Sequence, residues 1–541
     1  MSLPEPSVAC RETVRKLYAS GEKGCISAPH HAAAEAGLSI LAEGGTAIEA
    51  MIAAAATIAV VYPHMNGLGG DAFWLIKRKH QEPIVVSGCG RAAERATVRY
   101  YRDRGYDALP TRGSDAALLI PGAISSWKLA LDLVPATRRF GLERLLRDAM
   151  DKAISGCPVS RSLASTLEIF SPELSTIEGF EQVFLPDGRV PGAGEIYRQP
   201  ALGATLGKLA GNGLDSFYRG TVSKIHAQFL EEAGTPLRLE DFQSYSAEYS
   251  KPLSLPVSVG TLFNTPPPTQ GLASLLILGV FDQLGVSTAD ETSYIHHLVE
   301  ATKCAFAVRN AKLGDPDFMD ARPSECLAPA LISKAAVSIN PAKAVPWPGP
   351  SQVGGTIWMG AADSEGTVVS FIQSLFWEFG SGLACPETGI VFENRGAGFS
   401  LANGPNQLAP RKRPFHTLNP AMAELHDGRV MAYGTMGGDG QPQTQAAVFT
   451  RYVLSGRGLA DAIADPRWLL GKTWGNSSLS LKLEGRFSEQ TEEQLVRLGH
   501  DTERVSDYAE MMGHAGAVVL HPSGHLEGAS DPRSDGAAFA I

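Results

Sequence analysis

The stretch SQVGGTIWMGAAD, residues 351–363, contains the abrupt start of a strand. Gly354 and Gly355 give the backbone a freedom that a strand interior disfavours. Thr356 and the apolar residues after it are typical of a buried strand. After a turn at DSEG, a second run, TVVSFIQSLF (residues 367–376), predicts the neighbouring strand. The pattern therefore indicates either an ordinary turn and strand or a Gly355–Thr356 peptide bond that is made to break.

The segments around this stretch indicate a layered fold. INPAKAVPWPGPSQVGG, residues 339–355, is rich in proline and glycine, which predicts a flexible, exposed connection. Helical periodicity dominates residues 118–331, and it also predicts a helix over residues 30–45. A helical first part joined to a strand-rich second part favours one layered α+β structure.

Composition excludes several classes of function. The 541-residue chain is 44% hydrophobic and 19% charged, as in soluble globular proteins. A net charge of −10 argues against binding of nucleic acid or an anionic membrane surface. The longest apolar run, residues 50–63, is too short to span a bilayer, and we recognise no secretory signal. Seven cysteines without a CxxC pair predict a reducing compartment, with the cytoplasm as the default.

Cutting before Thr356 would place a hydroxyl and a free α-amine on one residue. The hydroxyl is a poor nucleophile until a base removes its proton. An α-amine with a pKa of about 7.7–8.0 is suited to that task near neutral pH. The cut can be self-inflicted: the hydroxyl attacks the Gly355 carbonyl, an N-to-O acyl shift follows, and water releases the ester. Gly437 and Gly438 are the candidate oxyanion donors, since consecutive glycine N–H groups can point at one atom.

Six collinear segments resemble the γ-glutamyltranspeptidase family of N-terminal nucleophile hydrolases. The segments are SAPHHAAAEAGLSILAEGGTAIEA, NGLGGDAFWLI, PPPTQG, EATKCAFAVRNAKLGDPDF, GTIWMGAADSEGTVVSFIQSLFWEFGSG and GTMGGDGQPQ. The resemblance implies a four-layer αββα sandwich and self-cleavage before the threonine of a strand that ends in aspartate. It places that threonine at Thr356, the aspartate at Asp363, a supporting hydroxyl at Ser374, and the oxyanion glycines at Gly437 and Gly438.

The same resemblance implies two subunits cut from one precursor. Residues 1–355 would form the large α subunit, and residues 356–541 the small β subunit that begins with the catalytic threonine. Both would belong to one structural unit, an αβ heterodimer. Whether two such heterodimers associate is left open.

Departures from the family pattern fall where γ-glutamyl groups are bound. The expected arginine is replaced by Cys89, with Arg91 two residues on, and the expected asparagine by Phe376. The glutamine and aspartate expected in the next loop are replaced by Arg395 and Gly398. The two adjacent serines expected after them are replaced by His416 and Thr417. An α-ammonium would lose its carboxylate partner, at a cost of several kcal/mol for a buried charge.

An amide that carries a carboxylate and no amine suits the altered set better. We expect Arg395 to hold an anion, with contributions from His416, Thr417, Arg91 and Phe376. Aromatic residues Trp358, Phe376 and Trp377 would make the pocket small. The chain is most similar to the branch that includes oxamate amidohydrolase, an activity of purine catabolism, and the glutaryl-cephalosporin acylases.

Several alternatives stay open at this stage. Within the enzymes, they are a γ-glutamyltransferase or glutathione hydrolase with an altered pocket and a cephalosporin acylase. Outside them, the chain could be an uncleaved scaffold. Ser374 could be an ordinary strand serine, Arg395 could pair with Glu393 on the surface, and His416 could be a satisfied loop histidine. The sequence predicts no metal and no cofactor, because the paired histidines form no HExxH motif and GLGG (residues 67–70) lacks the dinucleotide-binding pattern.

Overall fold

Strands from both ends of the sequence interleave in two stacked antiparallel sheets. The computed structural model describes residues 16–320, 322–347, 354–472 and 478–541. The first sheet has the order β21 (Ala537–Ala540), β2 (Gly24–Ala28), β10 (Gly355–Asp363), β11 (Val368–Phe376), β3 (Asp71–Lys77), β4 (Ile84–Gly88) and β7 (Glu248–Ser250). The second has the order β1 (Tyr18–Gly21), β20 (Leu526–Ser530), β19 (Gly516–Leu520), β15 (Val430–Gly434), β14 (Ala421–Leu425), β9 (Gly260–Asn264) and β8 (Leu253–Val257).

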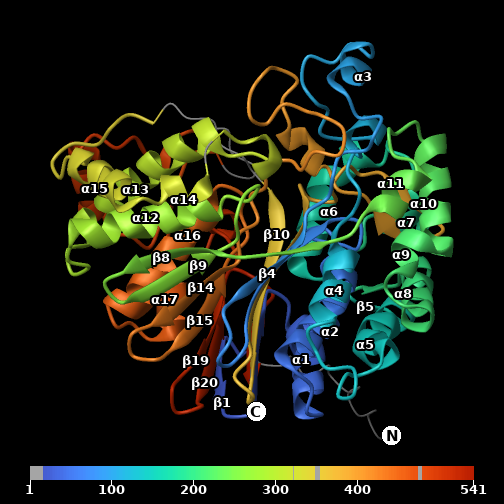
Figure 1. Ribbon diagram of the computed structural model, residues 1–541, viewed down its shortest axis with the longest axis horizontal. Coiled ribbons are helices and arrows are strands. Elements are labelled where there is room, and N and C mark those ends of the chain that lie inside the picture. The colour runs from blue at the N-terminus through green and yellow to red at the C-terminus, as the bar shows by residue number, and fades with distance from the viewer. Residues whose placement is uncertain (1–15, 321, 348–353, 473–477) are drawn as a thin grey trace, which may run out of the picture.

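Helices cover the outer face of each sheet, giving an αββα sandwich (Figure 1). The first sheet is covered by α1 (His31–Ala42), α2 (Ala47–Val61), α4 (Ala123–Leu131), α5 (Leu142–Ser155) and α8 (Pro200–Asn212). The second is covered by α12 (Gly271–Leu284), α13 (Glu291–Lys312), α15 (Pro329–Ser338), α16 (Gly440–Phe449) and α17 (Leu459–Ala464). The expected fold class, α+β with four αββα layers, is confirmed.

Shorter elements complete the chain. The other helices are α3 (Val98–Arg102), α6 (Arg161–Leu174), α7 (Phe180–Phe184), α9 (Ser216–Arg219), α10 (Thr221–Glu232), α11 (Leu239–Ser244), α14 (Pro323–Cys326) and α18 (Glu489–Arg497). Small sheets pair β5 (Cys157–Pro158) with β6 (Ile196–Tyr197), pair β12 (Ala384–Cys385) with β13 (Ile390–Val391), and join β16 (Trp468–Leu470), β17 (Leu481–Glu484) and β18 (Thr502–Val505). Among the described helices, none combines the length and apolarity needed to cross a bilayer.

The indole of Trp358 packs against two glycines of the second sheet, Gly434 and Gly516, which lets the two sheets approach closely. Trp358 of β10 is buried between them, and its Nε1–H donates to Ser370 Oγ at 2.9 Å. A Cβ added at Gly434 or Gly516 of the second sheet would lie 2.2 or 2.5 Å from the indole. The ring therefore fills the inter-sheet core. The expectation that Trp358 lines a substrate pocket is wrong, because the side chain points into this core.

The connection before β10 is more anchored than its composition suggests. Asn340 O lies 2.9 Å from His296 Nε2 of α13, and the Val345 N–H donates to Glu300 Oε2 of α13 at 3.1 Å. Ala344 is buried, and its N–H donates to Leu498 O at 2.7 Å. Residues 339–347 form an irregular and mostly exposed connection, as expected, although buried polar groups of α13 bind its backbone. Residues 348–353 lie outside the described part of the chain.

Asp363 ties the β10–β11 hairpin to the first helical layer. Its carboxylate accepts the N–H groups of Ala47 at 2.8 Å, Thr367 at 2.9 Å and Glu365 at 3.0 Å. Ala47 begins α2, so a buried carboxylate binds the donor end of that helix. The two strands that carry the site are thereby fixed to α2.

We expect Asp363→Ala to lower the free energy of unfolding by about 3 kcal/mol, because it leaves buried N–H groups without an acceptor. Chemical denaturation measures the change. Glu365→Ala on the same turn removes only an exposed pair with Arg138 and should cost less than about 1 kcal/mol. Equal losses for the two variants would contradict the assigned role of Asp363.

Candidate active site

Thr356 and Ser374 bring two hydroxyls to the carbonyl oxygen of Gly355. Thr356 Oγ1 donates to Gly355 O at 2.6 Å, and Ser374 Oγ donates to the same oxygen at 2.6 Å. The two hydroxyl oxygens are 3.2 Å apart, and both residues are buried. This geometry is that of the intact Gly355–Thr356 peptide bond. A carbonyl held by two donors is polarised toward nucleophilic attack.

A bulge between β10 and β11 creates this arrangement. Gly355 pairs with Phe376 and Ile357 pairs with Gln373, so Ser374 and Leu375 together face the single residue Thr356. The Phe376 N–H donates to Ser374 Oγ at 2.8 Å and orients that hydroxyl. Phe376 has φ of 80°, which is unusual for a residue with a side chain. The end of β11 is therefore a strained turn that positions Ser374.

Gly437 and Gly438 form the turn between β15 and α16. Their φ angles are 114° and 54°, in the region that favours glycine. Neither N–H donates a hydrogen bond to another described residue. Gln270, in the turn before α12, donates through Nε2 to Gly438 O and to Thr417 O, both at 2.8 Å. One amide side chain thus connects the glycine turn to the segment that holds Thr417.

A buried arginine fixes Gln270 in turn. Arg309 of α13 donates through Nη1 to Gln270 Oε1 at 2.8 Å. The same guanidinium binds Asp439 in two hydrogen bonds of 2.7 and 3.1 Å. Arg309 and Asp439 are both buried, so this bidentate pair anchors the start of α16 beside the glycine turn.

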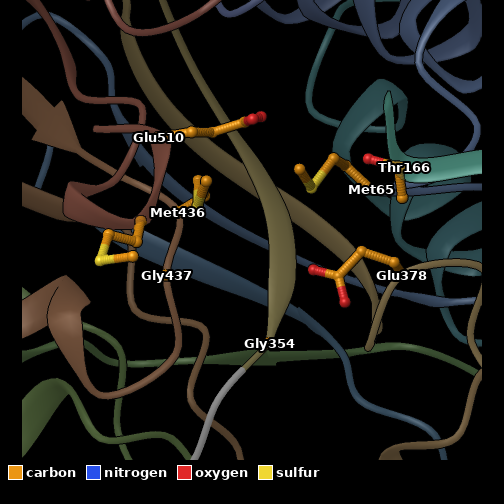
Figure 2. Close-up of a pocket in the computed structure, with 8 residues that line it drawn as sticks. Met65, Thr166, Gly354, Glu378, Met436, Gly437 and Glu510 are labelled. Carbon is orange, nitrogen blue, oxygen red and sulfur yellow. The ribbon is translucent and has the colours of Figure 1, made fainter. Parts of the chain in front are cut away.

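A small cavity of about 20 Å³, about the room that one water molecule needs, lies beside Gly354, the residue that precedes the Gly355–Thr356 bond. Its lining comprises Met65, Thr166, Gly354, Glu378, Met436, Gly437, Glu510 and Met511. Figure 2 shows the carboxylate of Glu378 turned toward β10 from one side, whereas Glu510 extends from the other side, farther from Gly354. The cavity thus contains a candidate oxyanion glycine, the residue before the scissile one, and two acidic groups.

Arg395 lies on the other side of Phe376. Its guanidinium sits over the Phe376 ring, 3.8 Å from the centroid, and Nη1 donates to Thr417 Oγ1 at 3.3 Å. The ring also packs near Gly354, where an added Cβ would be 3.2 Å from it. Arg395 is fully buried rather than paired on the surface. Arg395, Phe376 and Thr417 therefore form one group next to the scissile bond.

His416 continues this group toward β3. Its Nε2 lies 3.0 Å from Asp71 Oδ2, and its Nδ1 accepts the Leu418 N–H at 3.3 Å. Burial lowers the pKa of His416 to about 4, so the ring is neutral at pH 7 and its Nε2–H donates to Asp71. His416 thus holds Asp71 and presents no charge of its own.

The charges of the cluster follow from burial. Burial raises the pKa of Glu393 well above its usual value, and the neighbouring Asp71 raises it further. The positive charge of Arg395 acts in the opposite direction and lowers the pKa of Glu393. Burial lowers the pKa of Arg395 to about 10, which still leaves the guanidinium charged. The group next to Phe376 accordingly offers one persistent cation for a substrate anion.

Arg91 lies apart from this cluster. It donates to Glu248 Oε1 at 2.7 Å and to the Arg411 carbonyl at 3.1 Å near the surface. The structure thus brings together Arg395, His416, Thr417 and Phe376 of the expected binding set, and it directs the Arg91 side chain elsewhere.

Several neighbours were not expected from the sequence: Asp71, Gln270, Arg309, Glu378. Asp71 and Gln270 belong to the segments NGLGGDAFWLI and PPPTQG, whose collinear match was the available signal. Arg309 likewise lies in EATKCAFAVRNAKLGDPDF, and Glu378 lies in GTIWMGAADSEGTVVSFIQSLFWEFGSG. Glu393 was considered only as a surface partner of Arg395, whereas the structure buries both residues.

Two groups of side chains have the spacing of potential metal ligands: Asp71 with Cys89 and His416, and His296 with Glu300 and His500. In the first, burial raises the pKa of the Cys89 thiol, which disfavours the thiolate that metals bind. In the second, Lys303 Nζ binds Glu300 at 2.6 Å and supplies the positive charge already. The chemistry of both groups favours hydrogen bonding and ion pairing over metal binding.

Comparison with known proteins points to one family. The family described as gamma-glutamyltranspeptidase matches residues 33–541. The oxamate amidohydrolase proenzyme of Klebsiella pneumoniae is 52% identical over 520 residues, which cover 95% of this chain and 98% of that protein. A glutathione hydrolase-like proenzyme of Bacillus subtilis is 38% identical over 525 residues, which cover 96% of this chain and 99% of that protein. The crystal structure of cephalosporin acylase from Bacillus halodurans has a TM-score of 0.90 at 30% identity and covers both chains completely.

We expect Arg309→Met to lower the free energy of unfolding by about 3–5 kcal/mol, because it removes the guanidinium that binds a buried carboxylate. Denaturant titration of the purified variant measures the change. Arg457→Met removes an ion pair with Asp465 that is largely exposed, and it should cost less than about 1 kcal/mol. A loss for Arg309→Met no larger than that of the control would show that Asp439 is held by other groups.

Proposed function

Because the chain belongs to the gamma-glutamyltranspeptidase family and is a hydrolase of carbon–nitrogen bonds, we propose that it is a self-processing amidohydrolase with Thr356 as its nucleophile. The observation that carries this proposal is the pair of hydroxyls on the Gly355 carbonyl oxygen, at 2.6 Å each. This arrangement supports attack on the Gly355 carbonyl carbon by the hydroxyl of the adjacent Thr356.

Maturation follows from these positions. Thr356 Oγ1 attacks the Gly355 carbonyl carbon while Ser374 Oγ donates to the carbonyl oxygen, as it does in the uncut chain. The proton of the hydroxyl passes to the Thr356 nitrogen, the bond between that nitrogen and the Gly355 carbonyl carbon breaks, and the peptide becomes an ester with a free amine. Water then releases the two fragments, residues 1–355 and 356–541. Because strands from both sides of the cut alternate within each sheet, we expect the fragments to remain associated as an αβ heterodimer.

In the mature enzyme, the freed α-amine of Thr356 takes the proton of its own hydroxyl. The hydroxyl attacks the substrate amide, and the N–H groups of Gly437 and Gly438 stabilise the oxyanion together with Ser374. The amine of the substrate leaves, and water hydrolyses the acyl-enzyme. Preorganised donors of this kind contribute about 3–4 kcal/mol to transition-state stabilisation in related chemistry.

The Arg395 group supports a substrate with a carboxylate on its acyl part. The buried cation beside Phe376 can bind that carboxylate, and burial disfavours the charged form of the nearby Glu393. A compact carboxylated amide such as oxamate fits this chemistry, and the 52% identity to an oxamate amidohydrolase proenzyme supports the same choice. The six described cysteines are free thiols, which supports a reducing compartment such as the cytoplasm.

We expect Thr356→Ala to abolish both the cut and amide hydrolysis, because it removes the attacking oxygen. Thr356→Ser keeps that oxygen and should retain both at reduced rates. Denaturing electrophoresis of the purified variants measures the cut, and ammonia release measures turnover. A Thr356→Ala chain that still divides into two fragments would reject Thr356 as the nucleophile. A wild-type chain that stays intact would favour the scaffold alternative.

Arg395→Met should lower kcat/KM for oxamate by about tenfold to hundredfold, since a hydrogen bond to a charged group contributes about 1.5–3 kcal/mol. Arg395→Lys keeps the charge without the planar fork and should fall in between. Ammonia release from oxamate is compared with anilide release from a γ-glutamyl anilide and acyl release from a glutaryl-cephalosporin. Preference for either of the last two would replace oxamate with a γ-glutamyl or cephalosporin substrate.

A further inference from the structure

Glu378 packs directly against the residue whose carbonyl is attacked. A Cβ added at Gly355 would lie 2.9 Å from Glu378 Oε1 and 3.1 Å from Met65 Sδ. Since Cβ and the carbonyl carbon of a residue are about 2.5 Å apart, Oε1 lies within about 5.4 Å of the Gly355 carbonyl carbon. This upper limit leaves room for no more than one water molecule between the carboxylate and the electrophilic carbon. Glycine is also the residue that leaves room for this contact.

The carboxylate reaches Gly355 from the cavity rather than from the packed core. Glu378 lines the cavity together with Gly354 and Gly437, and Figure 2 shows its side chain directed toward the start of β10. The hydroxyls of Thr356 and Ser374 are both committed to the carbonyl oxygen of Gly355. Glu378 is therefore an acidic group at the scissile residue to which the mechanism above gives no task.

The ester formed during maturation must be hydrolysed by water, and Glu378 is placed to activate that water. Once the acyl group has moved to Thr356 Oγ1, the released amine of the same residue can attack the carbonyl again and restore the peptide bond. That return is intramolecular, so it has a large advantage over attack by water. Cutting requires a water molecule that is activated and positioned at the ester carbon.

We propose that Glu378 is the general base that activates this water, a role that rests on the proposed self-cleavage at Thr356. The water oxygen forms a bond to the Gly355 carbonyl carbon as its proton passes to the Glu378 carboxylate. The bond between that carbon and Thr356 Oγ1 then breaks, and the proton passes from Glu378 to Oγ1. The products are the carboxyl group of Gly355 and the free hydroxyl of Thr356.

Glu378→Gln tests the role in the full-length chain, because it keeps the size of the side chain and removes its basicity. We expect its cut to be about a hundredfold slower or more, the usual range for a lost general base. Hydroxylamine attacks esters without a base, so adding it to the folded variant should restore cutting. Mass spectrometry should then find a hydroxamate at the C-terminus of residue 355. Glu378→Asp should retain partial cutting in water alone.

Glu510→Gln is the matched control. Glu510 lines the same cavity, but it accepts a hydrogen bond from Ser162 at 2.6 Å and pairs with His514 at 3.3 Å. Its variant should therefore be cut at the wild-type rate, with no dependence on hydroxylamine.

Two results would overturn the proposal. Wild-type cutting of Glu378→Gln would assign water activation to another group, such as the released amine. Slow cutting that hydroxylamine does not restore would mean that the substitution impairs formation of the ester or the fold. Neither result affects the assignment of Thr356, which fails only if Thr356→Ala is still cut.

Discussion

The carbonyl oxygen of Gly355 accepts two hydroxyl hydrogen bonds, and the chemistry of the site depends on this contact. It exists because a bulge in β11 sets Ser374 and Leu375 opposite the single residue Thr356. A regular register would turn one of the two hydroxyls to the opposite face of the sheet. The strained turn at Phe376, with φ of 80°, maintains the bulge and supplies the N–H that orients Ser374.

Opposite charges flank this carbonyl. Arg395 stacks on Phe376 on one side, whereas the cavity on the other carries Glu378 and Glu510. Under the proposed function, a carboxylate on the acyl part of the substrate would lie on the Arg395 side. Gln270 connects the Gly437–Gly438 turn to the segment of Thr417 through the carbonyl groups of Gly438 and Thr417, so this turn and the cationic group are held at a fixed separation.

Much of the framework could be predicted from the sequence. The strands around residues 356–362 and 367–376 appear as β10 and β11 because long apolar runs bounded by glycine turns specify buried strands strongly. Adjacency of those strands also brought Ser374 to Thr356. The exposed connection at residues 339–347 was also predicted, but its local composition says nothing of the buried polar groups of α13 that bind its backbone.

By itself, the sequence determined the layered α+β class, the threonine that begins a strand after two glycines, and the order of the six segments that resemble the family. Only the tertiary structure decided which charges reach the site. The sequence predicts Arg395 as the anion ligand with a contribution from Arg91, yet Arg91 pairs with Glu248 and only Arg395 is buried on Phe376. Asp71 and Glu378 likewise become neighbours of the site through contacts between segments far apart in the chain. Such contacts depend on sheet register and burial, and local spacing does not encode either of them.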